Sequence, residues 1–217
     1  MNQSQFKKGI VYATIGSLWW GVLGTIFFKY VSMMGALEVT LHRLIWTSLI
    51  LLLTTLIFKK IKVFKSIIKQ KKKLLILLVT GVLIFLNWGT WIYAISINKI
   101  IDASYGYFIF PILNVFLGYV FLKEKLNFKR KISILIVIAS SVYLLFNFES
   151  FPVVGFLVAF FWSFYNLLRK KVNVDTDVGL LIESLFILPI ALIVCYFIFK
   201  SGYNDFSFHQ PYNILLL

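Results

Sequence analysis

The 217-residue chain has few charges and almost nothing that could carry metal or nucleophilic chemistry. Charged residues make up 14% of it and hydrophobic residues 60%, whereas a soluble domain contains about 25% charged residues. Its one cysteine, Cys195, cannot form an intrachain disulfide, and the two histidines do not form a metal-binding motif. HExxH, GxSxG and phosphate-loop motifs are also missing. These absences exclude an ordinary soluble enzyme, a disulfide scaffold and a disordered chain, and no cofactor is expected.

Long apolar runs take the place of the missing charge, and the mean hydropathy is +0.90. A helix needs about 20 apolar residues to cross the hydrocarbon core of a membrane. The runs of suitable length are Gly9–Val31, Ala36–Phe58, Leu74–Ser96, Ile101–Leu122, Ile132–Phe148, Pro152–Leu168 and Val178–Phe199. They predict an all-α fold, a polytopic transmembrane helix bundle. A further run begins at Asn213 and stops at Leu217, so we expect a sequence truncated at its C-terminus and a longer functional protein.

Basic residues alternate between the two sides of this bundle. Eighteen of the 22 lysines and arginines precede the first run or follow the second, fourth and sixth, while the opposite loops hold Lys29, Lys99 and Lys200. This distribution predicts a multi-pass protein of the inner or plasma membrane with a cytoplasmic N-terminus. It also argues against nucleic-acid binding, because the net charge of +14 is spread over loops. The lysine-rich segment 59–73 is interpreted as a solvated loop rather than an amphipathic surface helix.

Arg43 is the one basic residue that this topology leaves inside an apolar run. It lies about 10 Å below the outer surface. A charge at the centre of a spanning helix costs about 2.5 kcal/mol or more, so Arg43 should face a partner or a water-filled space. The polar and aromatic residues expected at a similar depth are Asn87, Trp88, Tyr105 and Tyr107. This common level predicts a central cavity with Arg43 facing substrate; snorkelling to the interface and pairing with Glu38 are the alternatives.

Glu183 is the only acidic residue well inside the apolar runs of the second half. It lies about 8 Å from the cytoplasmic end of its run, and Arg169 at the end of the preceding run is near that level. A structural ion pair is favoured over a coupling-ion or proton site. Pro111 stands in the middle of its own run, where it can kink a helix and shape a binding path.

The chain also shows a short internal match. The first and sixth runs align with Trp20 opposite Trp162, and the seventh run then matches the second. Five runs separate the two copies, and an odd number reverses the orientation of the second copy in the membrane. The match therefore suggests inverted repeats, a common architecture of transporters.

Motifs along nearly the whole chain give it a family resemblance. They are Trp20-Gly21, Phe28-Lys29, Leu41-His42-Arg43-Leu44-Ile45-Trp46, Asn87-Trp88, Ala103-Ser104-Tyr105-Gly106-Tyr107-Phe108, Pro111, Leu122-Lys123-Glu124-Lys125-Leu126, Phe164-Tyr165, Arg169-Lys170-Lys171, Leu181-Ile182-Glu183-Ser184 and Leu188-Pro189. In these motifs the chain resembles the RarD branch of the EamA drug/metabolite transporter superfamily. It departs from the pattern at Gly24, Phe110 and Asn166, where proline, asparagine and glycine are expected.

The resemblance implies ten helices in two inverted halves of five around a central path, with both termini cytoplasmic. Residues 1–148 then form the first EamA repeat, and residues 149–217 part of the second, with helices six, seven and the start of eight. About seven of the ten helices would be present.

We expect a secondary transporter, not an enzyme, that moves a small metabolite or drug by alternating access. The expected substrate-pathway residues are Trp20, His42, Arg43, Trp46, Asn87, Trp88, Tyr105, Tyr107, Pro111 and Tyr165, with Glu183 and Arg169 as an ion pair or proton site. The expected partners are a small-molecule substrate and the lipid bilayer, with a homodimer left open. The alternative is a membrane-embedded structural, assembly or lipid-acting protein.

Overall fold

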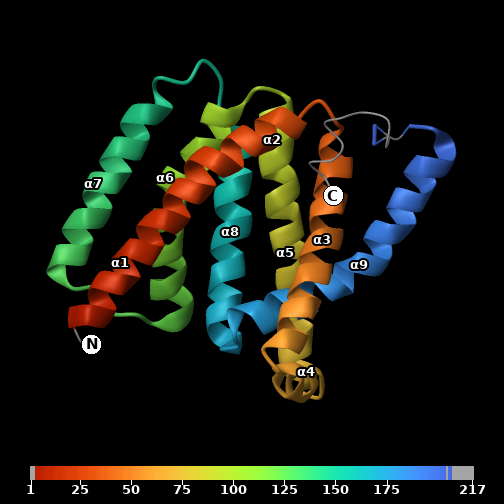
Figure 1. Cartoon of the computed structure of the whole chain (residues 1–217). Coiled ribbons are helices and arrows are strands. Elements are labelled where there is room, and N and C mark those ends of the chain that lie inside the picture. Colours follow the sequence, from red (N-terminus) through yellow and green to blue (C-terminus); the bar gives the residue numbers. More distant parts are fainter. Residues whose placement is uncertain (1–2, 204, 207–217) are drawn as a thin grey trace.

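The computed structural model describes residues 3–203 and 205–206, and the regular elements in these residues are helices (Figure 1). They are α1 (Gln3–Leu18), η1 (Trp19–Gly24), α2 (Thr25–Val31), α3 (Ala36–Ile57), α4 (Ile61–Ile68), α5 (Lys71–Ser96), α6 (Ile100–Leu122), α7 (Phe128–Leu145), α8 (Val153–Val172) and α9 (Thr176–Ser201). The all-helical bundle expected from the apolar runs is confirmed. The expected start of a further helix at 213–217 lies outside the described residues.

Six stretches among the described residues are long and apolar enough to cross a membrane, whereas the sequence suggested seven. They are the run from α1 through α2, and helices α3, α5, α6, α8 and α9. The expected fifth run forms α7, a helix of 18 residues. Its first turns contain Lys129, Arg130 and Lys131. Because α7 is only 18 residues long, a stretch of 18 residues in it must include these three charges. Its composition therefore does not qualify it as a membrane span.

The helices pack around α5, which contacts α3, α6, α8 and α9 (Figure 1). The closest approach joins α6 to α8 through two glycines. Gly155 N donates a hydrogen bond to Asp102 Oδ1 over 2.9 Å, and a Cβ atom on Gly155 would lie 2.3 Å from the Asp102 carbonyl oxygen. Gly106 faces the Gly155 carbonyl equally closely. Small residues permit this contact because they let two helix backbones approach.

The lysine-rich segment contains the short helix α4, so its interpretation as a solvated loop was wrong. Ile67 of α4 is buried in a cluster with Leu77 of α5 and Ile182 of α9, while the lysines of α4 are exposed. The helix has an apolar face that a solvated loop would not have. The prediction was based on the lysines, which dominate the composition of the segment, and did not take the spacing of its isoleucines into account.

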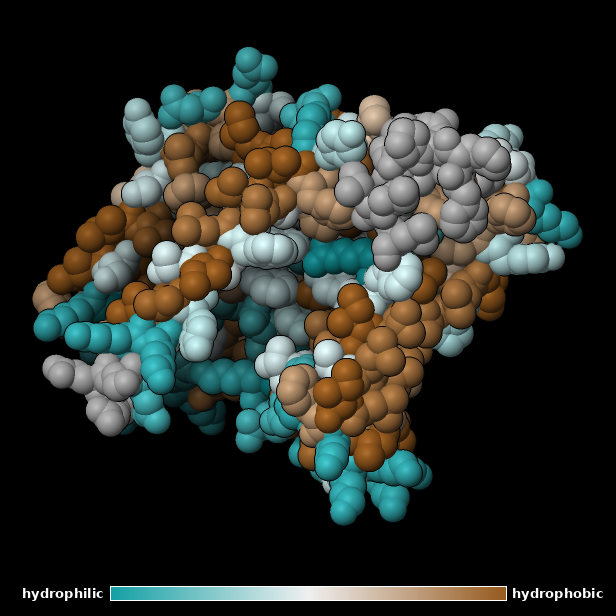
Figure 2. Space-filling model, in the orientation of Figure 1, coloured by the Kyte–Doolittle hydropathy of each residue, from teal (hydrophilic) through white to brown (hydrophobic). Residues whose placement is uncertain are grey.

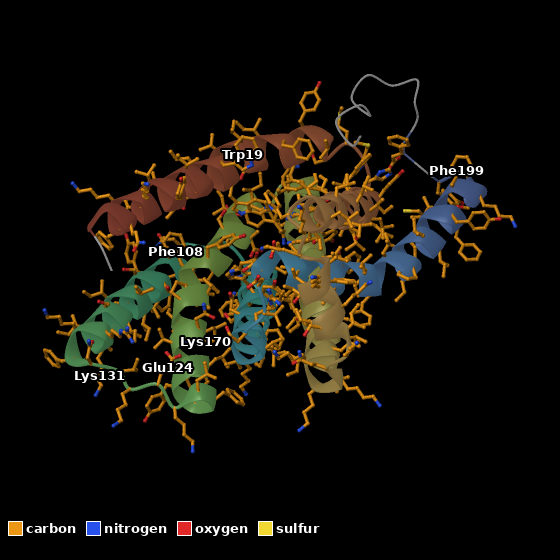
Figure 3. The ribbon with its side chains drawn as sticks, turned by 60° about the horizontal axis from the view of Figure 1, so that its bottom comes forward. Trp19, Phe108, Glu124, Lys131, Lys170 and Phe199 are labelled. Atoms are coloured by element: carbon orange, nitrogen blue, oxygen red, sulfur yellow. The ribbon has the colours of Figure 1, made fainter. Side chains whose placement is uncertain are left out.

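The loops rich in lysine and arginine gather at one end of the bundle, together with the start of α1 and with α4 (Figures 1 and 2). Ion pairs join the elements at this basic end. Lys60 Nζ donates to Asp177 Oδ2 over 2.6 Å, and this bond raises the pKa of the Lys60 ammonium. Lys170 pairs with Glu124 where α8 and α6 end (Figure 3).

Candidate functional site

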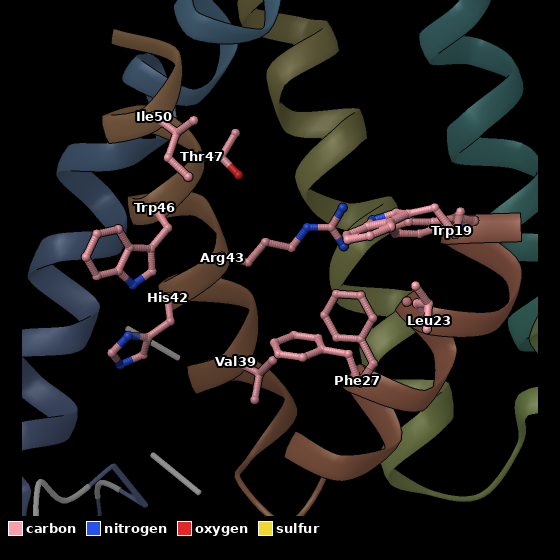
Figure 4. Close-up of a pocket in the computed structure, with 12 residues that line it drawn as sticks. Trp19, Leu23, Phe27, Val39, His42, Arg43, Trp46, Thr47 and Ile50 are labelled. Carbon is pink, nitrogen blue, oxygen red and sulfur yellow. The ribbon is translucent and has the colours of Figure 1, made fainter. Parts of the chain in front are cut away.

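Arg43 extends from α3 toward the first helix, while His42 and Trp46 leave α3 in another direction (Figure 4). Its guanidinium carbon lies 4.1 Å from the ring centroid of Trp88, 5.1 Å from that of Trp20 and 5.2 Å from that of Phe28. Cations are attracted to the faces of aromatic rings, most strongly where water is excluded. Aromatic faces from three elements therefore hold this cation in the apolar part of the bundle.

No carboxylate neutralises Arg43 among the described residues. Its Nη1 atom is buried and has no hydrogen-bond partner in this part of the chain. Glu38, the expected alternative partner, instead accepts hydrogen bonds from the backbone nitrogens of Asp205 and Phe206 over 2.8 and 3.0 Å. A buried guanidinium N–H without an acceptor costs free energy. Arg43 is thus prepared to bind an acceptor that the described chain does not supply.

A single π-helical turn, η1, positions Trp20 against Arg43. It interrupts the first spanning run at Trp19–Gly24, and Trp20 packs edge-to-face on Phe28 at a centroid distance of 6.1 Å. Such π-helical turns are rare in proteins, and those that occur often lie at functional sites. Apart from Gly21 and Gly24 within it, nothing in the sequence indicated this turn.

A central cavity of about 570 Å³ lies between η1, α3, α5, α6, α8 and α9. In Figure 2 the molecule is hollowed beneath the diagonal of the first helix. The residues expected from the sequence that line the cavity are Trp20, Arg43, Asn87, Trp88, Tyr107, Tyr165 and Arg169. Asn87 is fixed there because its Nδ2 atom donates to the Val158 carbonyl oxygen over 3.0 Å, which joins α5 to α8.

Other residues expected on the pathway lie elsewhere. His42 and Trp46 line a second cavity of about 600 Å³, which Trp20 and Arg43 also line (Figure 4). Tyr105 donates its hydroxyl to the Ser141 carbonyl oxygen of α7 over 2.8 Å, away from the central cavity. Pro111 is exposed on α6. Tyr105 and Tyr107 are two residues apart, so they face different sides of one helix.

At the basic end of the central cavity, Arg169 lies beside Glu183. Arg169 Nε is 3.5 Å from Glu183 Oε1, and the Glu183 side chain is 0% exposed. Arg169 also lies close against Gly179, where a Cβ atom would come within 1.9 Å of Arg169 Nη1. Its Nη2 atom makes long hydrogen bonds of 3.4–3.5 Å to carbonyl oxygens of residues 174–176. The arginine therefore joins the end of α8 to the start of α9.

Three further polar or aromatic residues of the cavity wall were not expected from the sequence: Trp162, Asn166 and Thr176. Trp162, Asn166 and Arg169 are spaced by four and three residues, so they share one face of α8. That spacing, with the match of Trp162 to Trp20, was the available signal. No signal in the sequence pointed to Thr176, because a threonine at the start of a helix usually only caps that helix.

Comparisons with known proteins identify the family of the chain. The model of the EamA-like transporter family matches residues 7–146. An uncharacterized transporter of Vibrio cholerae is 34% identical over the whole chain, which covers 72% of that protein. Protein RarD of Escherichia coli is 32% identical, again over the whole chain and 73% of the relative.

The uncharacterized transporter YojE of Bacillus subtilis is 32% identical over 97% of this chain and 69% of its own length. No solved structure matches the chain. The family model covers well over half of the chain, and the relatives match it from end to end. The chain is therefore a membrane transporter that belongs to the EamA-like transporter family, as a RarD-type member.

Proposed function

We propose that the protein is a secondary transporter that moves a small organic anion across the inner or plasma membrane by alternating access. Arg43 binds the carboxylate or phosphate group of the substrate. Trp20 and Trp88 form aromatic walls beside it, with Asn87, Tyr107 and Tyr165 along the same path. The proposal rests chiefly on Arg43, whose buried Nη1 atom has no acceptor among the described residues and which lines the central cavity.

The charge of the central cavity supports an anionic substrate. Two of the three arginines of the chain, Arg43 and Arg169, line it, and no aspartate or glutamate is among the described residues of its wall. Positive charge in a cleft with low-dielectric walls concentrates anions. The cavity reaches Arg169 and Thr176 at the basic end of the bundle, and we infer that this end faces the cytoplasm.

We also infer that the chain contains two repeats of opposite orientation, residues 1–148 and a part of the second over 149–217. Trp20 and Trp162, equivalent in the internal match, both line the central cavity. Transporters built from inverted repeats place their substrate at the interface between the repeats. The position of these two tryptophans supports that arrangement.

Binding of small anions to the purified chain tests the role of Arg43. Benzoate, phenyl phosphate and succinate are titrated in detergent and compared with neutral benzamide. Binding is followed by tryptophan fluorescence, since Trp20 and Trp88 contact Arg43. At least one anion should bind more tightly than benzamide, and Arg43→Ala should weaken it about 30-fold or more, because a buried charge partner contributes about 2 kcal/mol or more.

The matched control is Arg130→Ala, which removes an arginine from the exposed start of α7. This variant should bind the anion as the unmodified chain does. Thermal unfolding of both variants separates loss of binding from loss of fold. If none of the three anions binds better than benzamide, or if Arg43→Ala folds and binds normally, the anion site is not at Arg43.

A further inference from the structure

Glu183 is held by two hydroxyl groups in the interior of the bundle. Its Oε1 atom accepts from Thr80 Oγ1 over 2.6 Å, and its Oε2 atom accepts from the Tyr165 hydroxyl over 3.2 Å. Arg169 stands 3.5 Å away, within ion-pair range but beyond an ordinary hydrogen bond. Neutral donors on α5 and α8 thus bind the carboxyl group, and the arginine contributes charge without a hydrogen bond.

The Thr80 hydroxyl has two acceptors within reach but only one hydrogen. Besides Glu183 Oε1, its Oγ1 atom lies 3.1 Å from the Leu77 carbonyl oxygen of the same helix. A hydroxyl can donate once and accept at the same time. With Glu183 ionised, Thr80 donates to the carboxylate. With Glu183 protonated, the carboxylic acid donates to Thr80, which donates in turn to Leu77. Both protonation states are therefore fully hydrogen-bonded at the same heavy-atom positions.

Arg169 links this carboxyl group to the central cavity. It lines the cavity, its side chain is 10% exposed, and its Nη1 atom is buried without a hydrogen-bond partner among the described residues. Glu183 is not part of the cavity wall, but Tyr165 is. The Tyr165 hydroxyl therefore offers a route for a proton between cavity water and Glu183.

Electrostatic attraction couples the protonation of Glu183 to the binding of an anion in the cavity. Ionised Glu183 and Arg169 sum to zero charge, and protonation of Glu183 leaves one uncompensated positive charge beside the cavity. An isolated charge is costly in a low-dielectric site. An anion held in the cavity by Arg43 lowers the cost of that extra positive charge, because Arg169 lines the same cavity, so the protonated glutamate and the bound anion stabilise each other.

We propose that Glu183 is the coupling site of the transporter and takes up one proton when an organic anion binds in the cavity. This proposal rests on the anion transport proposed above. A hydronium ion in the cavity gives its proton to the carboxylate by way of Tyr165, one O–H bond forms on Glu183, and water remains. Proton and anion then occupy the same state and cross in the same direction. For a monovalent anion this movement is electroneutral.

The groups that face Glu183 come from two neighbouring helices. They are the Thr80 hydroxyl of α5, and the phenol of Tyr165 and the guanidinium of Arg169 on α8. Helices α3 and α4 also pack against α9, but within the described residues neither supplies an ionisable side chain that bonds to or pairs with Glu183. Among the described residues, Tyr165 and Arg169 are therefore the ionisable groups that bond to or pair with Glu183.

The pH dependence of anion binding tests the coupling. Benzoate dissociation constants are measured between pH 5.5 and 8.5, where benzoate stays ionised. If binding takes up one proton, the constant should rise toward tenfold per pH unit once Glu183 is ionised in the free protein. Glu183→Gln imitates the protonated state, so its constant should match the low-pH value at every pH. A flat profile in the unmodified chain, or an unchanged slope in the folded variant, overturns the proposal.

A second measurement needs no ligand. Phenylglyoxal modifies arginines, and mass spectrometry gives the rate at Arg169 relative to exposed Arg130 at fixed pH. Glu183→Gln should raise this ratio several-fold, because Arg169 loses its ion-pair partner. An unchanged ratio in a folded variant contradicts the coupling even where benzoate fails to bind. A raised ratio without benzoate binding contradicts only the anion substrate, so the two proposals fail separately. If Glu183→Gln does not fold, the pH profile of the unmodified chain decides.

Discussion

Arg43 is tolerated in a membrane-spanning helix because aromatic faces surround it. A cation–π contact in a desolvated place contributes about 2 kcal/mol, and the rings of Trp20, Phe28 and Trp88 all lie within 5.2 Å of the guanidinium carbon. These contacts offset much of a cost of about 2.5 kcal/mol or more. The ring faces do not accept hydrogen bonds from the N–H groups that lie in the plane of the guanidinium. Arg43 is therefore stabilised and still able to bind an oxyanion.

Thr80 gives a prediction at the same scale. Thr80→Val removes the hydroxyl that donates to Glu183 Oε1 over 2.6 Å and leaves a buried oxygen unsatisfied. Such a loss costs about 1–3 kcal/mol, so thermal unfolding in detergent should move to a lower temperature. Thr80→Ser keeps the hydroxyl and should lie much closer to the unmodified chain. Equal unfolding temperatures for Thr80→Val and Thr80→Ser would show that this bond does not stabilise the fold.

At the scale of elements, the crossing of α6 and α8 depends on Gly106 and Gly155. A Cβ atom on Gly155 would meet the Asp102 carbonyl oxygen at 2.3 Å, and backbone on both sides leaves no flexible side chain to move. Gly155→Ala should therefore separate the two helices and lower the free energy of unfolding by about 1–3 kcal/mol or more. The unfolding temperature in detergent measures the effect.

Gly16→Ala is the matched control. Gly16 lies in α1, where an added Cβ atom meets nothing within 4 Å. Alanine favours helix over glycine by about 1 kcal/mol, so this variant should unfold at the same or a slightly higher temperature. Destabilisation of similar size in both variants would mean that the response does not depend on the crossing of α6 and α8.

The elements also show how far sequence reasoning reaches. Spanning helices are apparent from the sequence because hydropathy over about 20 residues is a local property. Depth along a helix is likewise local, and it placed Arg43, Asn87 and Trp88 at one level. Rotation about the helix axis depends on neighbouring helices, which is why Tyr105 faces α7 while Tyr107 lines the cavity. The contact of Thr80 with Glu183 joins residues 103 positions apart, and nothing in the sequence around either residue indicates its partner.

At the scale of the molecule, charge is sorted between the two ends. Lysines and arginines cluster at the basic end, and three of the acidic residues, Glu124, Asp175 and Asp177, form ion pairs there. The central cavity extends from Arg43 to this end through Arg169. Excess positive charge around an opening raises the local concentration of anions. One charge distribution thus serves both the orientation in the membrane and the attraction of the proposed substrate.

The orientation itself can be measured, because Cys195 is the only cysteine. In a Cys195→Ser background, single cysteines are introduced as Lys62→Cys in α4 and Lys99→Cys in the loop between α5 and α6. Retention of lysine-rich loops on the cytoplasmic side predicts that a membrane-impermeant thiol reagent added to intact cells labels only the second variant. Lys62→Cys should become reactive after the membrane is permeabilised, which also shows that the thiol is accessible. Labelling of Lys62→Cys in intact cells, with Lys99→Cys protected, would invert the topology and place the basic end of the bundle outside the cell.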